Sequence, residues 1–403
     1  MQQSDKKLVQ IALTINIFEW YDFCISSYLA VTMGQVFFAS DNPILAVIQS
    51  FAVFALGYLV RPLGSILFGY LGDKFSSGFA LKYSTIMMAI PTIFIAILPV
   101  YHTIGYLAPL LLIFFRMIQG IAAGGELPIC SAYVFEHSQK QRNSTTLCGL
   151  TNTGAILGIL LASSVVLCLH LLFTQTAIYN WAWRLPFLLS LPLFLAILYF
   201  RKSMNLTGRH ADNNKIRIRG YAKAFTQTFF LIAFAQVSFY IILIWLPTYL
   251  QYFLGVPSNY ARISNVVALA TFAAAIALFG YLGRFINYKR LIIAGAVLLT
   301  ILVYPLFLLL PMVNFGILLL IQIIFALLLA SVSGLYFFTI GNLFPANIRN
   351  QAMAIGFTIP TTLFGGTAPL ICSYIIHKLG FMLFPSFYII AFGILAIVTL
   401  ITI

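Results

Sequence analysis

Five charged residues interrupt long apolar stretches of this chain, and they are its strongest candidates for chemistry. They are Glu19, Asp22, Arg61, Arg116 and Glu126. A charged side chain at the centre of a bilayer costs about 2.5–3.5 kcal/mol on insertion scales, so such residues usually face a cavity and carry function. Ion pairing that merely permits their burial is the alternative, but three carboxylates outnumber two guanidinium groups. We therefore interpret Glu19, Asp22 and Glu126 as candidates for binding a proton.

The spacing of three of these residues predicts that they lie at one depth. Glu19, Arg61 and Glu126 lie in three different apolar stretches. Each is 11 residues from the boundary of its stretch on the side of the N-terminus. At a rise of 1.5 Å per residue, each is about 16 Å from that boundary and close to the bilayer midplane. Glu19 and Asp22, three residues apart, are expected to share one helix face. We predict that Arg61 pairs with a carboxylate at this depth, with Asp22 and Arg116 nearer the outside.

Twelve apolar stretches are long enough to position these residues as membrane-spanning helices. Apolar residues make up 62% of the 403-residue chain and charged residues 7%, whereas about a quarter of a soluble domain is charged. We therefore predict an all-α integral membrane protein with 12 transmembrane helices. The stretches cover 8–38, 44–71, 83–102, 104–136, 143–172, 182–201, 224–252, 258–283, 289–311, 313–343, 350–377 and 380–403.

A sequence repeat divides the chain into two halves. Phe68–Asp73, placed in the loop after the second predicted helix, recurs as Phe279–Arg284 at an offset of 211 residues. A second echo, at an offset of 207 residues, pairs Arg142 with Arg349 and Gly149 with Gly356. Two echoes at nearly equal offsets indicate duplicated, pseudo-symmetric six-helix halves, an architecture that places a solute site between them.

Basic residues predict the orientation and the domain boundaries. Lys and Arg gather in the segments on the side of the N-terminus, and the opposite segments hold only Arg184, Arg262 and Lys378. This bias predicts a multi-pass protein of the cell inner membrane with both termini cytoplasmic. The predicted domains are an N-terminal six-helix bundle over 1–203, a cytoplasmic linker over 204–223 and a C-terminal six-helix bundle over 224–403.

The second half contributes neutral polar and aromatic groups, because no Asp or Glu occurs after Asp212. Aromatic faces bind ammonium groups, and Tyr or Gln can donate to a carboxylate, so these groups favour a zwitterionic or neutral solute. The two arginines leave an organic acid open as the alternative. The candidate solute-binding or charge-pairing residues are Trp20, Tyr21, Arg61, Arg116, Asn152, Gln236, Tyr240, Trp245, Tyr249 and Tyr336.

Several motifs resemble those of the major facilitator superfamily and, within it, the metabolite:proton symporter family. They are Asn16–Phe23, Arg61–Gly64 with Gly69–Lys74, Arg116–Gly120 with Gly124–Glu126, and Trp183–Phe187. Phe239–Leu250 is similar to the proline/betaine members, in which Asp stands at the position of Asn152. The resemblance implies the major facilitator fold and proton-driven uptake of a small solute by alternating access. It also implies a cytoplasmic gate, for which the candidates are Asp73, Lys74, Arg142 and Arg349.

Other classes of protein receive less support. A passive channel or facilitator, in which the buried charges are structural, is the second transport hypothesis. An enzyme is not expected, because the sequence shows no metal-binding cluster, nucleophile motif or phosphate-binding glycine loop, and we expect no cofactor and no metal. The expected partners are a small solute, protons and the lipid bilayer, without nucleic acid, and the expected state is a monomer. Since the chain ends at Ile403 within the last predicted helix, we expect no cytoplasmic C-terminal tail.

Overall fold

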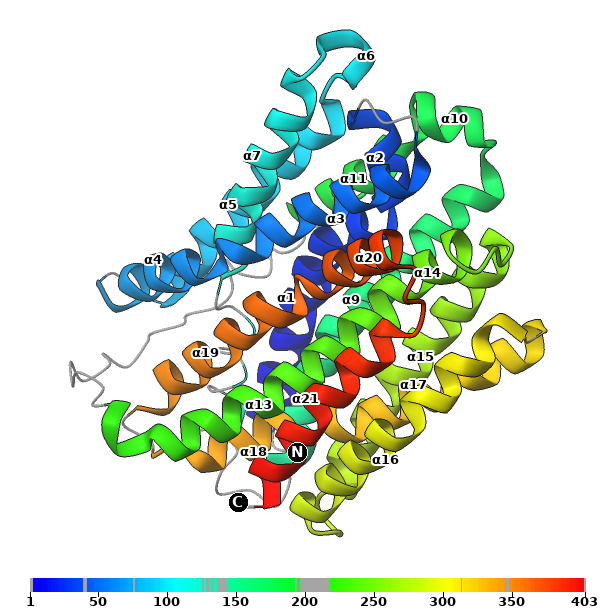
Figure 1. Ribbon diagram of the computed structural model, residues 1–403. Coiled ribbons are helices and arrows are strands. Elements are labelled where there is room, and N and C mark those ends of the chain that lie inside the picture. Colours follow the sequence, from blue (N-terminus) through cyan, green and yellow to red (C-terminus); the bar gives the residue numbers. More distant parts are fainter. Residues whose placement is uncertain are drawn as a thin grey trace.

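The computed structural model of the chain is a bundle of helices whose two termini lie at the same end (Figure 1). We call this end the terminal end and the opposite one, which carries α6 (Tyr101–Ile104) and α10 (Gln175–Asn180), the far end. The structure describes residues 3–38, 42–74, 77–124, 127, 131, 134–135, 144–192, 194–195, 218–312, 314–345 and 348–401. Every regular element within these ranges is helical, which confirms the predicted all-α class.

Two of the predicted helices of the first half are each divided in two in the structure. Two breaks, at Leu29 and Val60, divide the first two predicted helices. Besides α6 and α10, the α-helices described in the first half are α1 (Gln3–Tyr28), α2 (Ala30–Phe37), α3 (Pro43–Leu59), α4 (Arg61–Lys74), α5 (Ser77–Ile97), α7 (Leu107–Ala122), α9 (Ser144–Leu172) and α11 (Leu185–Leu188).

The second half has two spans that change from α-helix to π-helix and back. The π-helical segments are Tyr240–Trp245 and Thr361–Gly365. The α-helices are α13 (Ala222–Phe239), α14 (Leu246–Tyr252), α15 (Ser258–Leu282), α16 (Tyr288–Leu309), α17 (Phe315–Ser333), α18 (Tyr336–Leu343), α19 (Arg349–Pro360), α20 (Ala368–Leu379) and α21 (Phe384–Ile401).

These helices have the lengths that a membrane requires. Within the described ranges, eight of them are long and apolar enough to span a bilayer, and the shorter apolar helices Tyr83–Ile97 and Leu107–Ala122 accompany them. One boundary differs from the prediction: the motif Phe68–Asp73 was expected in a loop, but α4 continues through it to Lys74. No proline follows Pro62 in this stretch, so backbone hydrogen bonding can continue past the end of the apolar run.

Two prolines free backbone carbonyls for contacts between the halves. Pro62 and Pro247 have no N–H to donate to the carbonyl four residues earlier, which belongs to Tyr58 and Leu243 respectively. The Tyr58 carbonyl accepts a hydrogen bond from the Thr362 hydroxyl of the second half, at 3.3 Å. The Leu243 carbonyl accepts one from the Tyr28 hydroxyl of the first half, at 3.0 Å. At each proline, the carbonyl four residues earlier therefore forms a bridge between the halves.

At the terminal end, the halves meet through glycines. Gly149 of α9 faces Gly280 of α15, and a Cβ added at Gly149 would lie 3.2 Å from the Gly280 Cα and 3.3 Å from the Gly334 carbonyl oxygen. The Thr146 hydroxyl donates to the Gly280 carbonyl in the same place, at 3.5 Å. Backbones can approach this closely only where side chains are absent.

This packing predicts the effect of a bulky residue at the contact. In Gly149→Leu, the side chain should hold α9 and α15 apart, since overpacking costs about 1–3 kcal/mol. We expect solute uptake to fall about tenfold or more while the amount of protein in the membrane stays near the wild-type level. Gly316→Leu is the matched control, because a Cβ there meets only Asn314 at 3.5 Å. Equal uptake in the two variants would contradict the assignment of Gly149 to a contact between the halves.

Candidate functional site

Arg61 occupies a cage of aromatic rings at the start of α4. Its guanidinium carbon lies 4.1 Å from the ring centre of Tyr58, 4.2 Å from that of Phe23 and 5.3 Å from that of Trp20. Arg61 is only 5% exposed, and cation–π attraction to these rings stabilises its buried charge. Its Nε and Nη2 atoms have no hydrogen-bond partner within the described part of the chain. The charge is thus held by ring faces, and the guanidinium edge has donors to offer a ligand.

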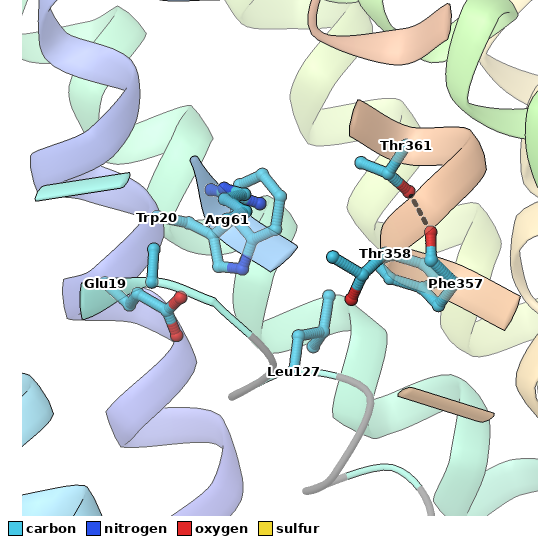
Figure 2. A pocket seen from close by; sticks show the side chains of 8 residues that line it. Glu19, Trp20, Arg61, Leu127, Phe357, Thr358 and Thr361 are labelled. Carbon is cyan, nitrogen blue, oxygen red and sulfur yellow. Dashed lines mark hydrogen bonds between the residues drawn. The ribbon is translucent and has the colours of Figure 1, made fainter. Parts of the chain in front are cut away.

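Glu19 and Arg61 line the same small cavity between the halves (Figure 2). Glu19 and Trp20 extend from α1, and Phe357, Thr358 and Thr361 face them from the second half. The cavity has a volume of about 10 Å³, which suits a single water molecule. Arg61 thus shares a cavity with a carboxylate, and its closest described contacts are rings.

A second cavity of about 20 Å³ adjoins the first, because Trp20, Leu127 and Phe357 line both. It brings together four of the predicted solute-binding residues: Trp20, Asn152, Gln236 and Tyr336. The Asn152 Nδ2 atom donates to the Ser333 carbonyl across the two halves, at 3.1 Å. Both cavities are too small for an amino acid, so in this closed arrangement the halves must part to admit a solute.

The hydroxyl groups of Tyr58 and Tyr240 hydrogen-bond to each other beside these cavities. Tyr240 begins the first π-helical segment, and such segments are frequent at functional sites. Sequence reasoning named Tyr240 and missed Tyr58. The available signal was its position three residues before Arg61, which on the single helix predicted over 44–71 would place the two side chains on neighbouring surfaces.

Asp22 and Arg116 lie inside the first half rather than at its surface with the second. Asp22 Oδ2 accepts hydrogen bonds from the Thr92 hydroxyl at 2.5 Å and from Gln119 Nε2 at 3.3 Å, while Oδ1 has no hydrogen-bond partner among the described residues. Arg116 is close enough to interact electrostatically with Asp22, and its Nη1 donates to the Phe23 carbonyl at 3.4 Å.

The prediction that Glu19 and Asp22 share one helix face is therefore wrong. Glu19 lines the cavity between the halves, whereas the partners of Asp22 come from α5 and α7. Residues three apart on a helix of 3.6 residues per turn differ in direction by about 60°. That angle is enough to aim one carboxylate at the second half and the other into the first.

Three further candidates stabilise packing within one half. The Tyr21 hydroxyl donates to the Pro186 carbonyl at 2.9 Å, and Trp245 Nε1 donates to the Ser373 hydroxyl at 2.8 Å. The Tyr249 hydroxyl donates to the Met382 carbonyl at 3.1 Å. None of the three lines either central cavity.

Of the four residues predicted to form a cytoplasmic gate, the structure describes the side chain of Arg349 alone. Arg349 Nε donates to the Gly341 carbonyl at 2.8 Å and to the Phe344 carbonyl at 3.1 Å, and its guanidinium lies 4.9 Å from the Phe135 ring centre. Phe135 belongs to the first half and packs where Gly341 has no side chain. Arg142 and Glu126, like the side chains of Asp73 and Lys74, lie outside the described residues.

Known proteins similar to this chain are transporters. The glycine betaine/proline/ectoine/pipecolic acid transporter OusA of Dickeya dadantii is 29% identical over 413 residues, which cover 98% of this chain and 82% of that protein. The proline/betaine transporter of Escherichia coli K12 is 26% identical over 416 residues, covering 98% and 83%. A putative proline/betaine transporter of Staphylococcus aureus COL is 29% identical over 402 residues, covering 97% and 86%.

Solved structures share the fold. The crystal structure of a D-xylose–proton symporter matches with a TM-score of 0.79 and 17% identity, covering 98% of this chain and 96% of that one. A partially occluded inward-open conformation of the Escherichia coli xylose transporter matches with a TM-score of 0.79 and 16% identity, over the same shares.

Residues 17–369 of this chain match the family described as the Major Facilitator Superfamily. This match confirms the resemblance drawn from the motifs and the predicted fold of 12 helices. The chain belongs to the major facilitator superfamily and is a multi-pass membrane protein of the secondary transporter class, not an enzyme.

Proposed function

We propose that this protein imports a small zwitterion of the proline or betaine kind, coupled to protons, across the cell inner membrane with both termini cytoplasmic. The observation that carries the proposal is the pairing of Glu19 and Arg61 in one cavity between the halves. Two opposite charges in one pocket match a solute that carries both. The names of the similar transporters of Dickeya dadantii and Escherichia coli support the same solute class.

The chemistry of the cavity suits each end of such a solute. The Nε and Nη2 atoms of Arg61, which have no hydrogen-bond partner among the described residues, can donate to a carboxylate in the charge-assisted geometry that guanidinium groups favour. The Trp20 ring and the Glu19 carboxylate can hold an ammonium or quaternary ammonium group. Thr358 and Thr361 add neutral hydroxyls from the second half.

An organic acid is less well supported. Paired arginines facing the cavity would favour that alternative, but Arg116 lies within the first half beside Asp22. A dicarboxylate would then meet one guanidinium and the carboxylate of Glu19. Repulsion from Glu19 disfavours such a solute in this pocket.

We assign the proton to the carboxylates of the first half. Asp22 is buried, accepts hydrogen bonds from two neutral donors and leaves Oδ1 without one among the described residues. Burial favours its neutral form and the nearby Arg116 favours its ionised form, so the carboxyl group can serve in either state. Glu19 and Glu126 remain candidates with it.

The proposed cytoplasmic gate consists of Asp73, Lys74, Arg142 and Arg349. The division into bundles over 1–203 and 224–403, joined by 204–223, and a monomeric state belong to the same proposal.

Uptake by the purified protein in liposomes tests the proposed function. Labelled proline, glycine betaine and 2-oxoglutarate are offered with and without an inward proton gradient. We expect accumulation of proline or glycine betaine above the outside concentration only when the gradient is present. Equilibration without accumulation would identify a facilitator, and accumulation of 2-oxoglutarate alone would identify an acid importer; either result would overturn the proposal.

The role of Arg61 predicts a loss of affinity. Arg61→Gln should raise the KM for a zwitterion about 10- to 100-fold, because a hydrogen bond to a charged group contributes roughly 1.5–3 kcal/mol. Arg61→Lys keeps the charge but not the two-pronged edge and should lie between this variant and the wild type. Arg290→Gln removes an exposed arginine at the start of α16 and is the control. An unchanged KM in Arg61→Gln would remove this residue from the solute site.

The assigned proton site predicts a separation of coupling from transport. In Asp22→Asn and in Glu126→Gln, a group that cannot ionise replaces the carboxylate at nearly the same size. We expect each variant to lose proton-driven accumulation while solute exchange across the same liposomes continues. Because exchange needs no net proton movement, it reports folding and solute binding in the same preparation. A variant that still accumulates solute would exclude its residue from the proton path.

A further inference from the structure

A third and larger cavity lies between the halves at the far end of the bundle. Its volume is about 170 Å³, far more than that of the two central cavities. The first half lines it with Tyr28, Ser163 and Tyr179, and the second half with Tyr252, Arg262 and Asn265. These residues belong to α1, α9, α10, α14 and α15, and α10 and α14 both lie at the end away from the termini (Figure 1).

Arg262 has no acidic partner in this cavity. The described residues that line the cavity include neither Asp nor Glu. The Arg262 Nη1 atom is buried and has no hydrogen-bond partner among the described residues. The side chain of Arg262 is half-buried, so its charge is only partly solvated, and binding an anion in the cavity would supply the missing counter-charge. The fork of the guanidinium group can bind a carboxylate with two parallel hydrogen bonds.

The floor of this cavity is a hydrogen-bonded cluster that separates it from the central cavities. The Leu243 carbonyl, four residues before Pro247, accepts from the Tyr28 hydroxyl at 3.0 Å and from Asn265 Nδ2 at 2.8 Å. The Ser163 hydroxyl donates to Asn265 Oδ1 at 2.9 Å and ties the cluster to the first half again. Tyr28 lies eight residues beyond Trp20, about 12 Å along the helix axis.

We propose that this cavity, which faces the outside if the termini are cytoplasmic as proposed and is called the outer cavity below, is a second solute site. In it, Arg262 binds the carboxylate of a small zwitterion before the solute reaches Arg61. The rings of Tyr28, Tyr179 and Tyr252 contact the rest of the solute, and they are able to hold an ammonium group. Passage to the central cavities then requires the hydrogen bonds on the Leu243 carbonyl to open. The identity of the solute rests on the proposed function, whereas the preference for a carboxylate rests on Arg262.

Equilibrium binding to the purified full-length protein tests this site without requiring transport. Labelled glycine betaine is titrated into Arg61→Gln, whose central site is weakened, and into the double variants that add Arg262→Gln or Lys378→Gln. Lys378 is exposed near the end of α20, so Lys378→Gln removes a positive charge outside the cavity. We expect the residual binding to weaken about tenfold with Arg262→Gln and to stay unchanged with Lys378→Gln.

Two further measurements separate recognition from damage. Choline, which has the quaternary ammonium group without the carboxylate, should bind equally well with and without Arg262→Gln. In otherwise wild-type protein, Arg262→Gln should raise the KM for uptake about tenfold with the maximal rate unchanged. Residual glycine betaine binding that ignores Arg262→Gln, or choline binding that falls with it, would overturn the outer site. If Arg262-dependent binding occurs without any uptake by the wild type, the outer site stands and the proposed function falls.

Discussion

A polar group in hydrocarbon must find its partner inside the protein, and this constraint determines where the polar groups of this chain gather. The carbonyls of Tyr58 and Leu243, each four residues before a proline, take hydrogen bonds from Thr362 and Tyr28 of the opposite half. A helix break that would be intolerable against lipid is stable here because the other half covers it. The surface between the halves is therefore polar for a structural reason before any solute is considered.

Most of the contacts that bridge the halves are neutral hydrogen bonds, which can break and be replaced by other hydrogen bonds. Tyr58 with Tyr240, Asn152 with Ser333 and Tyr28 with Leu243 are neutral hydrogen bonds, each contributing roughly 0.5–1.5 kcal/mol. Breaking a buried ion pair by removal of one partner costs about 3–5 kcal/mol by comparison. Neutral bridges and glycine packing let the halves part without exposing an uncompensated charge, which alternating access requires.

The pattern of apolar stretches was sufficient to predict the helices, and the cost of buried charge directed attention to Glu19 and Arg61, which line one cavity. Direction around a helix was harder to predict. Asp22 turns into the first half and Tyr21, Trp245 and Tyr249 serve packing, because one residue's step of about 100° separates a cavity from a helix contact. Tyr58 carries no charge and so gave no signal of burial cost. The π-helical segments depend on packing between helices far apart in sequence, which periodicity does not report.

The distribution of acids gives the two halves different tasks in the proposed mechanism. Since no Asp or Glu follows Asp212, every carboxylate that can take up a proton within the membrane belongs to the first half. A change of charge there reaches the second half through the residues that touch both. Arg61 contacts the Tyr58 ring, and the Tyr58 hydroxyl meets Tyr240 at the start of a π-helical segment. Protonation beside Arg61, or a solute carboxylate drawing the guanidinium out of its aromatic cage, would act directly on the contact that holds the centre closed.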